Sequence, residues 1–204
     1  ILFKTFQKKL ILVEVVRHPL YMLIQQSLNF ERIFGNIRDI NIYYNYKNNE
    51  FPYFARSWEN EYNKLNNVEK AIKTIDYHTK INDSVRKNLN KFNKNIITIP
   101  FEIFVKNPDN YLKQIIDVTG TSFSSKTKKT IKSQNIPRKK IADGIDLKIY
   151  KRCGWTPSKK NLNEEQELNI RRNYAIKNNV SKKYLNILDK LSHNYEKKYI
   201  NNFK

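Results

Sequence analysis

The sequence predicts an α/β fold in which helices flank a parallel central sheet, within one domain that spans residues 1–204. Residues 10–16 form a β-favouring apolar run, interrupted only by Glu14, and a helical pattern follows directly. A second short apolar run, at residues 96–99, precedes a strong helix start at residues 107–109. Strands that alternate with helices are typical of parallel sheets.

The first strand is expected to be covered on both faces, because its apolar residues do not alternate with polar ones. Pro19 then suits the first turn of a helix, where its missing N–H costs nothing. The apolar face of this helix is formed by Leu20, Leu23, Ile24 and Leu28. Arg17 and His18 stand between the strand and the helix, and His18 is expected to cap or pack there.

The other segments read as helices and loops. Residues 35–54 are rich in Asn and Tyr and predict an irregular insertion. Ser57 and Asn67 are candidate caps of two helices, and a further helix is expected to restart at Asn82 or Asp83. Later helices are expected after residues 107–109 and ending near Gly120, near 125–133, over 163–177, and after Ser181 to the chain end.

Arg17 is a candidate anion-binding residue. The carboxyl end of a parallel strand is where open α/β sheets bind ligands, and a helix N-terminus there favours phosphate. A guanidinium at this point adds a charge-assisted contact. The alternative is an arginine that pairs with a nearby carboxylate, and the junction alone leaves both open.

Three segments together resemble one enzyme family. VEVVRHPLYMLIQQSLNF, a strand that runs into Arg-x-Pro and a helix, resembles the 3′-phosphate-binding segment of sulfotransferases that use 3′-phosphoadenosine 5′-phosphosulfate (PAPS). IITIPFEIFVKNPDNYLKQIIDVTGT resembles the later strand, acidic turn and helix of this family, with Phe101 and Glu102 in place of the usual Tyr-Glu. IPRKKIADG followed by YKRCGW is similar to its basic loop.

The resemblance implies a three-layer P-loop-like fold and transfer of a sulfuryl group from PAPS to a hydroxyl or amine of a small-molecule or glycan acceptor. It implies that Arg17, Arg138 and Lys139 hold the 3′-phosphate. The family's second ligand is a Ser eight residues after the Arg. Gln25 stands there and Ser27 is the nearest serine, so either is a candidate.

The resemblance also implies features that lie outside these residues. The first strand, the phosphosulfate loop and the catalytic base are expected upstream of residue 1, so we expect the chain to be a fragment. The expected co-substrate is PAPS, without a metal or a nucleic acid. The single Cys153 excludes an internal disulfide and a multi-cysteine metal site. With no leader or membrane-spanning run, we expect a cytoplasmic protein.

The net charge of +20 leaves a second function open. Such a charge is typical of proteins that bind nucleic acids or other polyanions. The lysines, however, are scattered over every segment, and the abundance of Lys, Asn, Ile and Tyr also fits A/T-rich codons. A third alternative is another phosphate-handling α/β enzyme, such as a kinase relative.

Overall fold

The computed structural model describes residues 5–6, 10–32, 42–88, 96–145 and 161–201. In this part of the chain the fold is mixed α/β and mostly helical. Strand β1 (Leu12–Val16) pairs in parallel with β4 (Ile96–Pro100), and Val15 lies opposite Ile99. The predicted parallel pairing of these two apolar runs is therefore confirmed, although the described sheet has only two strands.

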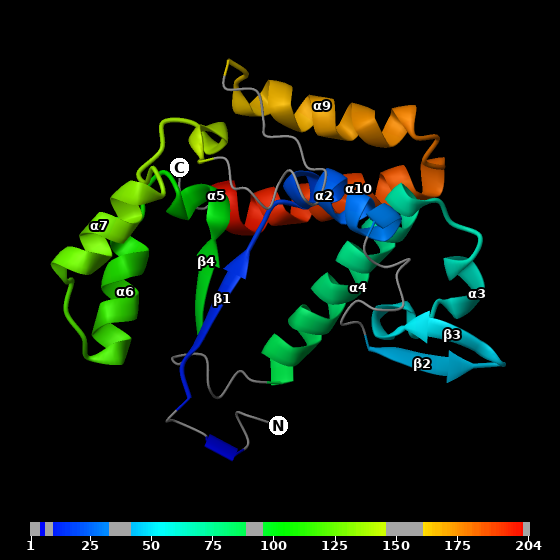
Figure 1. Ribbon diagram of the computed structural model, residues 1–204, viewed down its shortest axis with the longest axis horizontal. Helices are drawn as coiled ribbons and strands as arrows, with labels where there is room; N and C mark the ends of the chain where they lie inside the picture. The colour runs from blue at the N-terminus through cyan, green and yellow to red at the C-terminus, as the bar shows by residue number, and fades with distance from the viewer. Residues whose placement is uncertain (1–4, 7–9, 33–41, 89–95, 146–160, 202–204) are drawn as a thin grey trace.

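Four helices pack together beside this sheet (Figure 1). They are α2 (Pro19–Arg32), α4 (Asn67–Asn88), α9 (Glu164–Lys177) and α10 (Lys182–Tyr195). Helix α2 contacts each of the other three, and its fully buried Leu23 belongs to the same core cluster as Ile72 of α4, Ala175 of α9 and Leu188 of α10. A turn of π-helix, Glu196–Ile200, continues α10.

The segment after β4 contains the shorter helices α5 (Phe101–Phe104), α6 (Asp109–Thr119) and α7 (Ser125–Ser133). Helix α6 begins after Pro108 and ends at Gly120, whose φ of 64° places it in the left-handed region that glycine adopts without strain. The end at Gly120 and a start within residues 107–109 were predicted from sequence and are confirmed, whereas the predicted cap Asn107 is replaced by Pro108. A 3₁₀ turn, Ile141–Asp143, closes the segment.

The prediction that β1 is covered on both faces is wrong for the described residues. Val13 and Val15 are 42% and 61% exposed. The physical reason is that β4 is the one described strand that pairs with β1, and that the described helices leave these side chains uncovered. An apolar run shows that a strand is favoured, but it does not show what packs against it.

The irregular insertion predicted over residues 35–54 is also partly wrong. Its described part forms an antiparallel hairpin of β2 (Tyr43–Tyr46) and β3 (Asn49–Pro52), followed by a 3₁₀ turn, Tyr53–Ala55. Lys47 and Asn48 connect the strands with positive φ values of 50° and 62°. Two left-handed residues match the twist of tight hairpins.

Three predicted helix boundaries differ from the structure. Helix α4 runs through Asn82 and Asp83 without restarting, and both residues are exposed on its surface. Its cap is Asn66, whose side chain accepts the N–H groups of Val68 and Glu69 at 3.0 Å. The short helix α3 (Glu59–Tyr62) follows Trp58, not Ser57. None of the described helices combines the length and apolar character needed to cross a membrane.

Candidate functional site at the end of strand β1

The junction between β1 and α2 is organised by His18. The Leu20 N–H donates to His18 Nδ1 at 3.2 Å, which leaves Nε2 to contact Glu196 Oε1 at 3.1 Å. The His18 side chain therefore caps the helix and joins it to the turn after α10. The first N–H of α2 is therefore already bonded within the chain.

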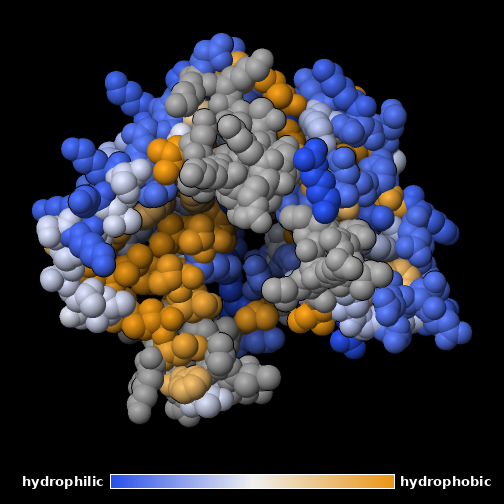
Figure 2. Space-filling model, viewed as in Figure 1, coloured by the Kyte–Doolittle hydropathy of each residue, from blue (hydrophilic) through white to orange (hydrophobic). Residues whose placement is uncertain are grey.

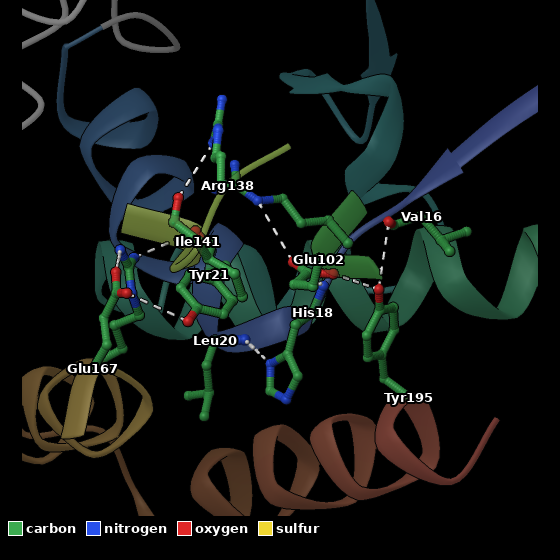
Figure 3. A network of polar contacts seen from close by, with 11 residues as sticks. Val16, His18, Leu20, Tyr21, Glu102, Arg138, Ile141, Glu167 and Tyr195 are labelled. Atoms are coloured by element: carbon green, nitrogen blue, oxygen red, sulfur yellow. Dashed lines mark hydrogen bonds and ion pairs between the residues drawn. The ribbon is translucent and has the colours of Figure 1, made fainter. Parts of the chain in front are cut away.

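Glu102, in α5, is the buried carboxylate of this junction (Figure 3). The Tyr195 hydroxyl donates to Glu102 Oε2 at 2.5 Å, and the His18 N–H donates to Oε1 at 3.2 Å. Arg17 Nε lies 3.9 Å from the same Oε1. Burial, together with the charge of Glu102, raises the pKa of Tyr195 above its ordinary value, so the phenol stays protonated as the donor.

Two arginines from distant segments meet at the ring of Phe101. The guanidinium carbon of Arg17 lies 4.9 Å from the ring centroid, and that of Arg138 lies 5.9 Å from it. The two guanidinium carbons therefore lie no farther apart than the sum of those two distances. Arg17 also lies 5.9 Å from the ring centroid of Tyr21. Aromatic rings at this range attract cations.

Arg138 is held in place by its own loop. Its backbone N–H donates to the Val105 carbonyl at 2.7 Å, and its Nη1 donates to the Ile141 carbonyl at 3.2 Å. A Cβ added to Gly144 would lie 2.8 Å from Arg138 Nη1. Glycine at this position therefore lets the loop backbone approach the guanidinium closely.

A third guanidinium completes the cluster from α9. The guanidinium carbon of Arg171 lies 4.8 Å from the ring centroid of Tyr21, and its Nη2 donates to Glu167 Oε1 at 2.7 Å. Burial and the charge of Glu167 raise the pKa of Tyr21 above its ordinary value. Two of the three arginines thus face a buried carboxylate: Arg17 lies near Glu102, and Arg171 pairs with Glu167.

The predicted phosphate-binding residues fall into two groups. Arg17 and Arg138 are brought together, and Lys139 is exposed beside Arg138. Ser27 is buried, and its hydroxyl donates to the Ile24 carbonyl at 2.8 Å and lies 3.1 Å from the Tyr174 hydroxyl. A phosphate could not reach Ser27 without displacing those partners, whereas Gln25 is partly exposed on the same helix.

Other members of the cluster were not predicted as site residues. Tyr21 lies four residues after Arg17, in the same segment that resembles the phosphate-binding one. Arg171 and Phe101 belong to the cluster because segments distant in sequence come into contact. No local sequence pattern predicts such contacts. YKRCGW, which belongs to the predicted basic loop, lies outside the described residues.

No group of three His, Cys, Asp or Glu side chains suited to a metal ion occurs among the residues that the structure describes. Scans of the chain against protein-family models, curated proteins and solved structures returned no match. The support for the candidate site therefore comes from its geometry alone.

Proposed function

We propose that the chain holds the 3′-phosphate of PAPS between Arg17 and Arg138 and serves in sulfuryl transfer to a hydroxyl or amine of an acceptor. The observation that carries this proposal is that both guanidinium groups lie at the ring of Phe101. One arginine follows β1 and the other belongs to the IPRKK segment, the two places from which the family resemblance implies phosphate contacts.

The electrostatics support an anionic ligand. Two guanidinium groups on one ring repel each other, and a phosphate dianion between them would replace that repulsion with two charge-assisted contacts. The Arg17 side chain is about a third exposed, so a ligand can reach it from solvent. The cluster lies where the parallel strands β1 and β4 both end, the edge at which open α/β sheets bind ligands.

The alternative role of Arg17, as the ion-pair partner of Glu102, explains the geometry of the cluster less well than phosphate binding does. Glu102 already accepts hydrogen bonds from Tyr195 and His18, and Arg17 Nε lies 3.9 Å away, at the outer limit of an ion pair. An ion pair with Glu102 also gives no reason for Arg138 to lie at the same ring. We therefore assign Glu102 the role of orienting Arg17.

In the proposed reaction, an acceptor oxygen or nitrogen forms a bond to sulfur while the bond from sulfur to the phosphate oxygen breaks. The acceptor proton goes to a base, for which we assign no residue among those described. Arg17 and Arg138 bind the 3′-phosphate and orient the nucleotide. The finer three-layer arrangement of the fold is part of this proposal.

The test is titration of adenosine 3′,5′-bisphosphate, the product nucleotide, into the protein and into Arg17→Ala. Loss of one charge-assisted contact should weaken binding about tenfold or more. Arg172→Ala is the matched control, because this substitution also removes one positive charge. Arg172 lies on α9 and is bonded to Asp189 at 2.8 Å. Equal affinity of the wild-type protein and Arg17→Ala would refute the proposal.

Polyanion binding is the second candidate, and one observation favours it. Helix α7 exposes four lysines on one short element: Lys126, Lys128, Lys129 and Lys132. A polyanion binder would lose affinity for a DNA oligonucleotide steeply as the salt concentration rises. It would not bind adenosine 3′,5′-bisphosphate in preference to other anions. Reversal of the four lysine charges would abolish that binding and leave bisphosphate binding intact if the first proposal is correct.

A further inference from the structure

Helix α7 lies at one side of the molecule and packs little against the rest of it. None of its residues is buried. Figure 1 shows α7 away from the group of four helices, and Figure 2 shows hydrophilic side chains over this edge of the molecule. Thr127 and Ile131 are half-buried and mark the inner side of the helix. The other side of α7 is therefore surface that the packing of the core leaves unused.

Four exposed lysines occupy this outer side. We call them the lysine face, and they are Lys126, Lys128, Lys129 and Lys132. At about 3.6 residues per turn, they cover an arc of about 160° on the side of the helix turned away from Thr127 and Ile131. The four charges therefore point to the same half of the surroundings.

The charge of the lysine face is not neutralised within the described part of the chain. The ion pairs that lysines make there all involve lysines outside α7. Lys80, for example, lies 2.6 Å from Asp76. The sequence between Asp117 and Asp143 also contains no acidic residue. The lysine face is thus complementary to a partner with negative charge.

Exposed apolar side chains indicate which kind of anionic partner fits. Phe123 is 37% exposed, and Lys128 Nζ lies 5.9 Å from the centroid of its ring, so the ring borders the lysine face. Val118, in the last turn of α6, is 38% exposed. Lysines beside exposed apolar side chains are typical of surfaces that bind anionic membranes. Phe123 is the one aromatic residue between Asp117 and Asp143, and a single ring gives no stacking platform for successive nucleic-acid bases.

We propose that α7 docks on the surface of an anionic membrane, with the lysine face on the lipid headgroups and Phe123 at the boundary between headgroups and acyl chains. The lysines supply the attraction to negative charge, and Phe123 supplies apolar contact that nucleic acid would not reward. The inference does not depend on nucleotide binding, because Arg17 and Arg138 are not part of the lysine face. It gives these four lysines a lipid partner in place of the DNA considered above.

The test is co-sedimentation of the protein with two kinds of vesicle. One kind is phosphatidylcholine with about 30% phosphatidylserine, an anionic lipid, and the other is phosphatidylcholine alone. The protein should bind the anionic vesicles and not the neutral ones, and binding should weaken as the salt concentration rises. Equal binding to both kinds of vesicle, or no binding to either, would overturn the proposal.

Substitution of the whole lysine face by glutamine should weaken binding to the anionic vesicles at least about 100-fold. The matched control changes the same number of exposed lysines to glutamine on three other helices: Lys87, Lys177, Lys182 and Lys190. It lowers the net charge of the protein equally and should retain most of the binding. An equal loss in the two variants would show that net charge alone attracts the vesicles, and would refute a role for α7.

Phe123→Ser separates a lipid partner from a nucleic-acid partner. It should weaken binding to the anionic vesicles about threefold or more and leave the affinity for a duplex DNA oligonucleotide unchanged. Ile176→Ser is the control, because Ile176 is 46% exposed on α9 and lies outside α7. Unchanged vesicle binding in Phe123→Ser, with displacement of the protein from vesicles by the oligonucleotide, would assign the lysine face to nucleic acid and overturn the proposal. All these variants should bind adenosine 3′,5′-bisphosphate as the wild-type protein does, so the membrane and nucleotide proposals can fail separately.

Discussion

The Tyr195 hydroxyl donates a 2.5 Å hydrogen bond to Glu102 Oε2, and this bond joins the last long helix to the carboxylate that lies 3.9 Å from Arg17 Nε. Both side chains are buried. The same carboxylate accepts the His18 N–H, so a single buried group connects α10, α5 and the end of β1. The carboxylate beside Arg17 is therefore held in part by a helix far from it in sequence.

Tyr195→Phe should destabilise the fold, since it leaves one oxygen of a buried carboxylate without its donor. We expect the free energy of unfolding in urea to fall by about 1.5–3 kcal/mol, the range for hydrogen bonds to charged groups. Tyr53→Phe is the control, because Tyr53 is 46% exposed and its hydroxyl makes only a 3.5 Å contact with His78. Equal effects of the two substitutions would contradict the role of Glu102.

Tyr62 should make the fold sensitive to alkali. Burial, with a smaller contribution from Tyr43, raises the pKa of Tyr62 to about 12 from its ordinary value of 10.0. A folded-state pKa above the unfolded one gives stability that is complete below the unfolded pKa and is lost as pH rises toward the folded pKa. Between about pH 10 and 12, the free energy of unfolding should therefore decline less steeply in Tyr62→Phe than in wild type. Parallel declines would exclude this cause.

Val13 and Val105 allow the same substitution to be compared in two environments. Val13→Thr on the exposed side of β1 should change the free energy of unfolding by less than about 0.5 kcal/mol. Val105→Thr places a hydroxyl at a fully buried position and should cost about 1–3 kcal/mol. A large loss in Val13→Thr, measured by urea unfolding, would mean that β1 is covered in solution.

Gly144→Ala should affect ligand binding more than folding. The added Cβ would lie 2.8 Å from Arg138 Nη1, so the flexible guanidinium must move away while the total charge stays the same. We expect calorimetry to show several-fold weaker binding of adenosine 3′,5′-bisphosphate, with an unfolding midpoint close to that of wild type. Undiminished binding would separate Arg138 from the proposed phosphate site.

The sequence predicted those parts of the fold that local chemistry determines. Helix α6 was recognised at both ends because Pro108 and Gly120 act through their own backbone geometry. The β2–β3 hairpin was missed because Lys47, unlike Gly or Asn, gives no sign of the positive φ that it adopts. The exposure of β1 was missed because burial depends on which distant segments pack against the strand.

The candidate site divides in the same way. Arg17 and Arg138 were identified from short motifs, each read within its own segment. Their meeting at Phe101 and the bond from Tyr195 to Glu102 result from tertiary packing, which no single stretch of sequence encodes. Ser27 was a candidate because of its residue type, but helical geometry turns it toward Tyr174 of α9.

The most direct test of the central claim compares two nucleotides in two proteins. Adenosine 3′,5′-bisphosphate and adenosine 5′-monophosphate differ by the 3′-phosphate, and the wild-type protein and Arg17→Ala differ by one guanidinium. If Arg17 holds that phosphate, the wild-type protein should prefer the bisphosphate by about tenfold or more, and Arg17→Ala should lose most of this preference. An equal preference in both proteins would contradict the account.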